Sequence, residues 1–521
     1  MSRHYASKLH PLVLAIGGWL LAGIALAKDP IVTVDTGALR GRTSGGIDIY
    51  RAVPFALPPV GDLRWRAPQL PRAWNGIRDA RELGPRCPQV NDPSTYAPGA
   101  RSEDCLYLNI WVPSSAAKLP VMIWIHGGGY TSGSGTMKLY DGKMLAKRGV
   151  ILITVNYRLG RLGFFAHPAL KADRDANYPD EPMGLYGILD LIAALKWVQR
   201  NIGAFGGDSA NVTIFGESAG GGAVTQLMVS PLAKDLFARA ISQSGATGTS
   251  LDTYMETSLP RRPSAMVLAK AFLGAEGIPE TIDAKGLRAL PVDKLLDTKL
   301  LLRHGVTFVD GIVIPDSIAK MFAEGRQHPV PFLLGANSHE GFGVRAEPNA
   351  MSQIAPDVSR DQLRILYGEK SETGYAQQWY GDSRFLAAAK YLAANMSRAG
   401  SGVGAPAFLY YMSYRTEAAR DFYSGVRHAD ELPYVFEALA QFETGAVAAD
   451  YRVSRQIATY WTNFAKTGDP NGTGLPRWDA YRTGDDNWFE FGEAGSGMKP
   501  GILAERLDFH ITRFKRIADI P

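Results

Sequence analysis

The sequence predicts an α/β fold with a mostly parallel central sheet that carries helices on both faces. Several short runs of largely β-branched residues are apolar on both sides, which is typical of strands buried within a sheet. Longer stretches with helical spacing separate these runs, and strands that alternate with helices indicate parallel pairing. The candidate strands are residues 121–125, 150–155, 212–215, 331–334 and 408–414, and the clearest helix is 185–202.

The composition predicts one large globular unit. The chain has 521 residues, and 46% of them are hydrophobic, so a large core can form. No linker, low-complexity tract or repeat interrupts the sequence, so we expect a single domain over residues 28–521. Within it, residues 251–304 are irregular and helix-rich, and we expect them to form a helical insertion over the functional site. The 56 Lys and Arg nearly balance the 51 Asp and Glu, so no nucleic-acid partner is expected.

The first 27 residues have the layout of a secretory signal peptide. Basic residues precede an apolar stretch over residues 11–26, and Ala25-Leu26-Ala27 is a small-x-small cleavage site. The alternative is an N-terminal membrane anchor, but the apolar stretch is shorter than the roughly 20 residues needed to span a bilayer. We therefore expect cleavage, no stable membrane span, and export to the periplasm or the medium.

The chain contains only two cysteines, Cys87 and Cys105. An exported chain meets an oxidising compartment, so we expect one disulfide between them. The alternative is a pair of free, buried thiols. Catalysis by a cysteine thiol is less favoured, because a complete set of residues for serine catalysis can be found elsewhere in the sequence.

A Gly-x-Ser-x-Gly segment over residues 216–220 places Ser218 between a predicted strand and a predicted helix. Such a serine stands on a sharp turn, where neighbours without bulky side chains leave its hydroxyl accessible. The start of the following helix directs its amides toward developing negative charge. Ser218 is therefore a candidate nucleophile.

A second glycine-rich segment, His126-Gly127-Gly128-Gly129, directly follows the strand predicted over 121–125. A phosphate-binding loop would need the Lys-Ser/Thr pair of a P-loop, which is absent here. An oxyanion hole needs amides that converge on one point without an intervening side chain. The sequence predicts that Gly128, Gly129 and Ala219 supply these amides.

These two motifs and Glu103-Asp104-Cys105-Leu106-Tyr107-Leu108-Asn109 resemble the type-B carboxylesterase/lipase family. The resemblance runs from about residue 30 to the C-terminus and implies an α/β-hydrolase fold. Its further matches are residues 61–68, 204–208, 243–245 and 461–464.

The resemblance also implies the partners of Ser218. The family's acid lies in a Gly-x-Asn-x-x-Glu-Gly segment, which points to Glu340, and its base lies in a segment that points to His428. The order Ser218, Glu340, His428 is that of the α/β-hydrolase fold. His339 competes with His428 as the base, but its place beside the acid favours a loop role. Three further residues resemble positions close to the family's triad: Glu217, Ser244 and Glu431.

The expected function is hydrolysis of small to medium carboxylic esters by a serine enzyme through an acyl-enzyme intermediate. We expect no cofactor and no metal, because neither His-Glu-x-x-His nor Cys-x-x-Cys occurs. The loop between the cysteines lacks Trp and has Tyr96 as its only aromatic residue, which argues against a dedicated choline esterase. The alternatives are a lipase, which would need an apolar lid, and a non-catalytic adhesion protein of the same fold. The sequence does not indicate the oligomeric state or the natural ester.

Overall fold

The computed structural model describes residues 29–90, 99–245, 248–249, 252–260, 262–296, 306–396 and 404–520. The expected signal peptide (residues 1–27), Tyr96 and part of the expected insertion at 251–304 lie outside these ranges. In the described part of the chain, no helix combines the length and apolar character needed to cross a membrane.

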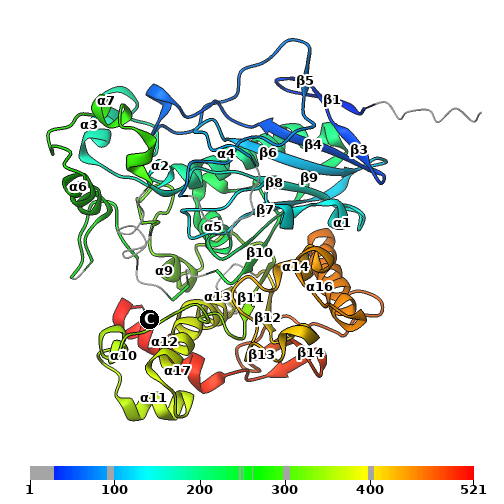
Figure 1. The fold of residues 1–521 in the computed structure, drawn as a ribbon, viewed down its shortest axis with the longest axis vertical. Helices are drawn as coiled ribbons and strands as arrows, with labels where there is room; N and C mark the ends of the chain where they lie inside the picture. The colour runs from blue at the N-terminus through cyan, green and yellow to red at the C-terminus, as the bar shows by residue number, and fades with distance from the viewer. Residues whose placement is uncertain are drawn as a thin grey trace, which may run out of the picture.

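The structure is built on a central sheet of 11 strands, and a separate 3-stranded sheet lies near the N-terminal end (Figure 1). The small sheet has the order β1-β2-β5 and the central sheet the order β14-β13-β12-β11-β10-β9-β7-β8-β6-β4-β3. The strands are β1 (Ile31–Val34), β2 (Gly37–Arg40), β3 (Arg42–Ser44), β4 (Ile47–Pro54), β5 (Ile77–Asp79), β6 (Tyr107–Pro113), β7 (Leu119–Ile125), β8 (Ile151–Val155), β9 (Gly207–Glu217), β10 (Arg239–Gln243), β11 (Phe332–Asn337), β12 (Ala407–Met412), β13 (Asn487–Gly492) and β14 (Gly495–Pro500).

The middle of the central sheet is parallel and its edges are antiparallel. Parallel pairing runs without interruption from β8 through β7, β9, β10, β11 and β12 to β13. The pairs β13–β14, β6–β8, β4–β6 and β3–β4 are antiparallel. The carboxyl ends of the parallel strands meet at one edge, where α/β sheets bind their ligands. The predicted fold class is confirmed.

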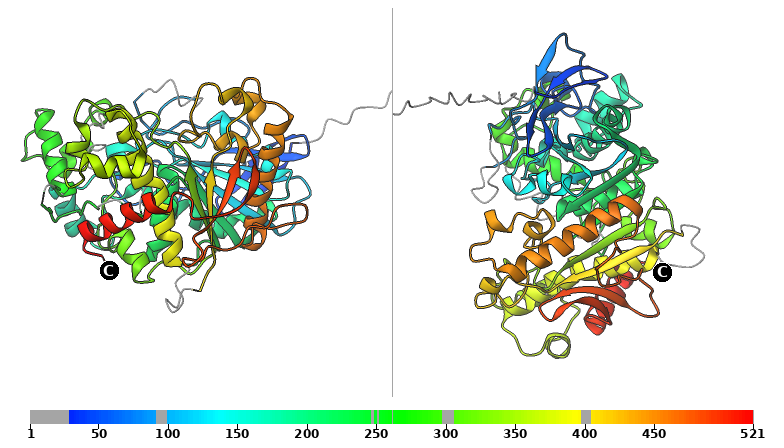
Figure 2. Two further views of the ribbon diagram at one scale, coloured as in Figure 1. Left: turned by 90° about the horizontal axis from the view of Figure 1, so that it is seen from below. Right: turned by 90° about the vertical axis from the view of Figure 1, so that its right-hand side faces the viewer.

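Helices cover both faces of this sheet (Figure 2). They are α1 (Lys143–Ala146), α2 (Gly160–Gly163), α3 (Pro168–Asn177), α4 (Tyr186–Asn201), α5 (Ala219–Val229), α6 (Ala265–Ala275), α7 (Ala284–Arg288), α9 (Ile318–Ala323), α10 (Ala350–Ile354), α11 (Arg360–Tyr367), α12 (Glu372–Gly381), α13 (Ala387–Met396), α14 (Leu432–Val435), α15 (Leu439–Phe442), α16 (Ala448–Thr467) and α17 (Ala504–Ala518). A π-helical turn, η7 (Asp382–Leu386), joins α12 directly to α13.

The central strands are buried on both sides because their alternate side chains enter two different cores. In β7, Ile123 and Ile125 pack in the core that also holds α4 and α5. The intervening Met122 and Trp124 pack in the core that holds α16. Side chains alternate across a strand, so a strand between two helical layers must be apolar throughout. This is why the apolar runs of the sequence located the central strands.

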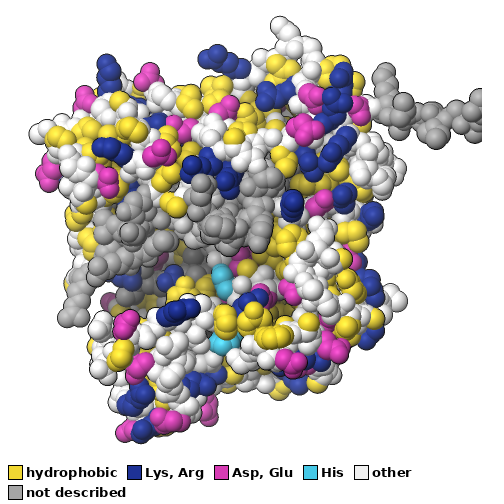
Figure 3. Space-filling model, in the orientation of Figure 1, with side chains coloured by type: hydrophobic (Ala, Val, Ile, Leu, Met, Phe, Trp, Pro, Cys, Tyr) yellow, Lys and Arg dark blue, Asp and Glu magenta, His cyan; other side chains and the backbone are white. Residues whose placement is uncertain are grey.

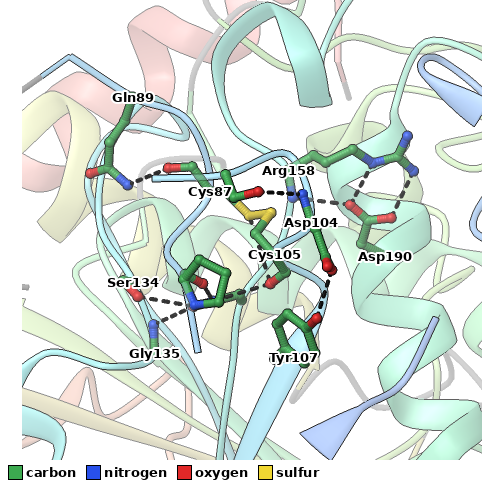
Figure 4. Close-up of a disulfide and its surroundings, with 12 residues drawn as sticks. Cys87, Gln89, Asp104, Cys105, Tyr107, Ser134, Gly135, Arg158 and Asp190 are labelled. Atoms are coloured by element: carbon green, nitrogen blue, oxygen red, sulfur yellow. Dashed lines mark hydrogen bonds and ion pairs between the residues drawn. A yellow bond between two sulfur atoms is a disulfide. The ribbon is translucent and has the colours of Figure 1, made fainter. Parts of the chain in front are cut away.

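The Cys87–Cys105 disulfide closes the loop that precedes β6 (Figure 4). Its Cα atoms lie 5.0 Å apart, and both cysteines are buried. The side chain of Gln89 donates to the carbonyl of Cys87 and to that of Gly133, so it ties this loop to the segment after β7. The disulfide thus braces the region beside the glycine-rich segment 126–129.

The described part of the expected insertion contains α6 and α7, and α7 packs against α3. In the stretch 372–396, both η7 and α13 pack against β11 and α17. No sequence pattern had indicated a π-helical turn there.

Candidate active site

Ser218 stands on a strained turn between β9 and α5. Its φ of 55° and ψ of −120° lie in a region that non-glycine residues rarely adopt. The flanking glycines are required by close backbone contacts. A Cβ on Gly220 would lie 2.0 Å from the carbonyl oxygen of Ile125, and a Cβ on Gly216 would lie 2.5 Å from the backbone of Gly220. The turn therefore tolerates no side chain at either position.

His428 and Glu340 complete a line of hydrogen bonds with Ser218. The Nε2 atom of His428 lies 2.8 Å from the Ser218 hydroxyl oxygen, and its Nδ1 atom lies 2.5 Å from Oε2 of Glu340. Glu340 follows β11 and His428 follows β12, and these strands are parallel neighbours. The amide of His339 donates to the carbonyl of Val426, which holds the two loops together.

The Glu340 carboxylate is fixed by donors on its second oxygen. The Ser244 hydroxyl and the Asn337 backbone amide both donate to Oε1, each at 2.6 Å. The carboxylate is buried, so these bonds and His428 replace its lost water. Glu340 is therefore held in one orientation toward the imidazole.

A second buried carboxylate, Glu431, lies behind the first. It accepts from the side-chain amides of Gln243 at 2.9 Å and Asn337 at 2.6 Å, and the Trp461 indole donates to Gln243. Burial, together with the negative charge of Glu340, raises the pKa of Glu431 to about 7. The sequence had suggested a place for Glu431 near the triad. It gave no role to Gln243 or Trp461, although both lie in segments that resemble the family.

Glu217 is the third carboxylate beside His428. Its Oε1 atom lies 3.2 Å from Nε2 of His428, the same nitrogen that faces Ser218. Burial raises the pKa of Glu217 to about 8, although the positive charge of His428 opposes this effect. Burial lowers the pKa of His428, but the negative charges of Glu217, Glu340 and Glu431 outweigh it, so the net direction is upward.

The amides expected to form an oxyanion hole lie on two segments that meet at Ser218. Gly128 and Gly129 have φ values of 102° and 62°, which favour glycine. A Cβ on Gly127 would lie 2.8 Å from the carbonyl oxygen of Glu217, so this segment packs against the turn that carries Ser218. Ala219 is the first residue of α5, where backbone amides have no partner within the helix.

His339, the histidine that competes with His428 as the base, makes its contacts away from the Ser218 hydroxyl. The imidazole of His339 contacts the Ser424 hydroxyl at 3.0 Å and packs edge-on against Phe342. His126 is buried, and burial lowers its pKa to about 4.

The ring of His428 packs against Phe385 of η7, with centroids 4.9 Å apart. The side chain of His428 remains 32% exposed, so solvent can reach the site. In the space-filling view, histidine side chains are visible beside a hollow in this face of the molecule (Figure 3).

The described residues contain no group of three or more His, Cys, Asp or Glu arranged to hold a metal ion.

Comparison with known proteins gives one family across the chain. The model of the carboxylesterase family matches residues 28–374 and 367–510. Fumonisin B1 esterase of Sphingopyxis macrogoltabida is 33% identical, over 94% of this chain and 91% of that protein. Para-nitrobenzyl esterase of Bacillus subtilis (strain 168) is 35% identical, over 87% of this chain and 92% of that protein.

Solved structures agree with the sequence comparisons. A PNB esterase structure superposes with a TM-score of 0.77 and 32% identity, covering 93% of this chain and 100% of that one. A thermophilic PNB esterase gives a TM-score of 0.79 at 32% identity, with the same coverage of both chains. The chain therefore belongs to the carboxylesterase family and is a carboxylic-ester hydrolase.

Proposed function

We propose that this hydrolase cleaves its esters through an acyl-enzyme formed on Ser218. The observation that carries the proposal is the unbroken line from the Ser218 hydroxyl through both nitrogens of His428 to Glu340. A serine hydroxyl is a poor nucleophile at neutral pH, so it needs a base within hydrogen-bonding distance. His428 occupies that position.

His428 accepts the proton of Ser218 as the oxygen attacks the ester carbonyl. Glu340 keeps the hydrogen of the imidazole on Nδ1 and stabilises the imidazolium that forms. The amides of Gly128, Gly129 and Ala219 hold the negative oxygen of the tetrahedral intermediate. His428 then protonates the leaving alcohol, and water repeats the sequence on the acyl-enzyme to release the carboxylic acid.

The expected substrates are small to medium carboxylic esters. The matched relatives include para-nitrobenzyl esterase and carboxylesterase 1D of Rattus norvegicus, and both names describe esterases. The names of these relatives do not favour the lipase alternative. The non-catalytic alternative is also disfavoured, because the Ser218 and His428 side chains are in hydrogen-bonding contact.

Replacement of Ser218 by Ala tests the proposal. We expect Ser218→Ala to lose hydrolysis of 1-naphthyl butyrate by at least about a thousandfold, because Ser218 supplies the hydroxyl that lies within hydrogen-bonding distance of the His428 imidazole. Ser209→Ala is the matched control and should retain full activity. Wild-type turnover by folded Ser218→Ala protein would overturn the assignment.

We further propose that the protein is exported after removal of residues 1–27. The Cys87–Cys105 disulfide supports an oxidising destination. N-terminal sequencing of the exported protein should then begin at Lys28. Retention of Met1 on a membrane-bound protein would indicate the anchor instead.

A further inference from the structure

A groove separate from Ser218 lies between the outer face of α16 and the turn that joins β13 to β14. Its volume is about 670 Å³, and none of Ser218, Glu340 and His428 lines it. In the right-hand view of Figure 2, α16 faces the viewer and the β13–β14 hairpin lies below it. The inner face of α16 packs in the core beside the sheet, so its outer face is free to form one wall.

Positive charge gathers along this groove. Arg452 and Arg455 lie on α16, and Arg420 and Glu493, which lie outside this helix, also line the groove. Glu493 already accepts from Arg415 at 2.7 Å and lies 3.7 Å from Arg420. Arg452 and Arg455 are exposed and form no ion pair with any residue that the structure describes.

The arrangement on α16 differs from an equivalent pair elsewhere in the chain. Arg513 and Arg516 also lie one helical turn apart, on α17, but Asp357 sits between them at 2.6 and 2.8 Å. Like charges at this spacing repel each other. The pair on α16 has the same spacing and lacks an acidic partner among the described residues, so it is suited to bind an anion from solution.

The remaining lining favours an organic ligand over a simple inorganic ion. The half-buried side chains of Val453 and Leu475 supply an apolar surface next to the arginines. The Ser496 hydroxyl donates to the side chain of Gln456 at 2.9 Å, and this hydrogen bond joins β14 to α16 at one point of the groove. A groove of this size exceeds the needs of one small ion and can hold a carbon framework with several charged groups.

We propose that this groove binds a small organic anion with two or more oxyanion groups, held by Arg452 and Arg455. The guanidinium group offers a planar pair of donors that matches carboxylate and phosphate oxygens. Both a polycarboxylate and an organic bisphosphate carry this chemistry. The site is independent of the reaction at Ser218.

Calorimetric titration with citrate and with glucose 1,6-bisphosphate tests the proposal at matched ionic strength. We expect saturable binding of at least one of them with one site per chain. Arg452→Ala and Arg455→Ala should each weaken it about tenfold, because each removes a charge-assisted contact. Arg516→Ala removes one charge from the control pair on α17 and should leave the affinity unchanged, as should Ser218→Ala.

The titrations show which class of anion the groove binds, or that it binds neither. Binding by citrate alone assigns a polycarboxylate, and binding by the bisphosphate alone assigns an organic phosphate. Absence of saturable binding by both would overturn the proposal. Equal weakening by Arg516→Ala would show only general attraction between charges, and loss of binding in Ser218→Ala would place the anion in the active site. Either result would also overturn it.

Discussion

The position of Glu217 beside the imidazole predicts how its removal changes the pH dependence of hydrolysis. Its Oε1 atom lies 3.2 Å from Nε2 of His428. Two opposite charges at that distance attract by about 1.3 kcal/mol even when fully screened by water, from 332/(80 × 3.2). About 1.36 kcal/mol corresponds to one pKa unit. The screened value is a lower bound, because Glu217 is buried although 32% of the His428 side chain is exposed.

The direction in which the pH profile shifts follows from the role of His428 as a base. Only the neutral imidazole can accept the Ser218 proton, so activity rises as the pH passes its pKa. The surrounding carboxylates raise this pKa above the ordinary value near 6.5, so the acid limb of kcat/KM should lie above pH 6.5. Glu217→Gln keeps the shape of the side chain and removes its charge, so it should move that limb to lower pH by at least about one unit.

The assay measures kcat/KM for 1-naphthyl butyrate from pH 5 to 10 at constant ionic strength. Glu82→Gln removes the same charge at an exposed position and should leave the limb in place. Thermal melting of both variants should match the wild type over this range. An unmoved limb in Glu217→Gln, or a shift to higher pH, would refute the electrostatic coupling.

Three further changes probe the parts that support the site. Gly220→Ala should destabilise the protein by more than about 3 kcal/mol, because its Cβ would lie 2.0 Å from the Ile125 carbonyl oxygen. Ser244→Ala removes a donor at 2.6 Å from Glu340 and should lower kcat about tenfold with little change in KM. Cys87→Ala, with its partner also replaced by Ala, should lower the free energy of unfolding by about 3 kcal/mol, because the disulfide closes a loop with a sequence separation of 18.

The glycine and serine changes each have a matched control variant. Gly203→Ala meets no atom within 4 Å and should leave the denaturation midpoint nearly unchanged. Ser209→Ala should keep wild-type kcat. Thiol labelling of the denatured, unreduced wild type should find no free cysteine, since the described structure pairs both. Normal stability of Gly220→Ala, unchanged kcat in Ser244→Ala, or an unaltered midpoint without the disulfide would contradict the respective reasoning.

The central strands were predictable because burial on two faces forces apolar residues at every position. The run 150–155 lies almost wholly on β8, and 121–125 lies within β7. The start of β9 was not predictable, because its mostly polar residues Asp208 to Asn211 extend the strand without an apolar pattern. The strand β14 of the hairpin β13–β14 also lacks an apolar pattern. This strand, Gly495–Pro500, contains two glycines and owes its conformation to pairing with β13.

The candidate site was predictable only in part. The turn around Ser218 follows from local sequence, because its glycines are required by contacts with nearby backbone. The positions of Glu340 and His428 came from resemblance to a family, since no local pattern joins residues 88 positions apart. The buried contact of Trp461 with Gln243 spans 218 positions. Such contacts depend on how the sheet brings distant segments together, and the sequence does not specify that arrangement locally.

The central claim is that Ser218 forms the covalent intermediate and that His428 activates it. The most direct measurement is peptide mapping by mass spectrometry after reaction with an alkyl p-nitrophenyl phosphonate. The account predicts one phosphonyl group per chain, located on Ser218, and a rate of labelling at least a hundredfold lower in His428→Ala. A stable adduct on another residue, or equally fast labelling of Ser218 without the imidazole, would contradict it.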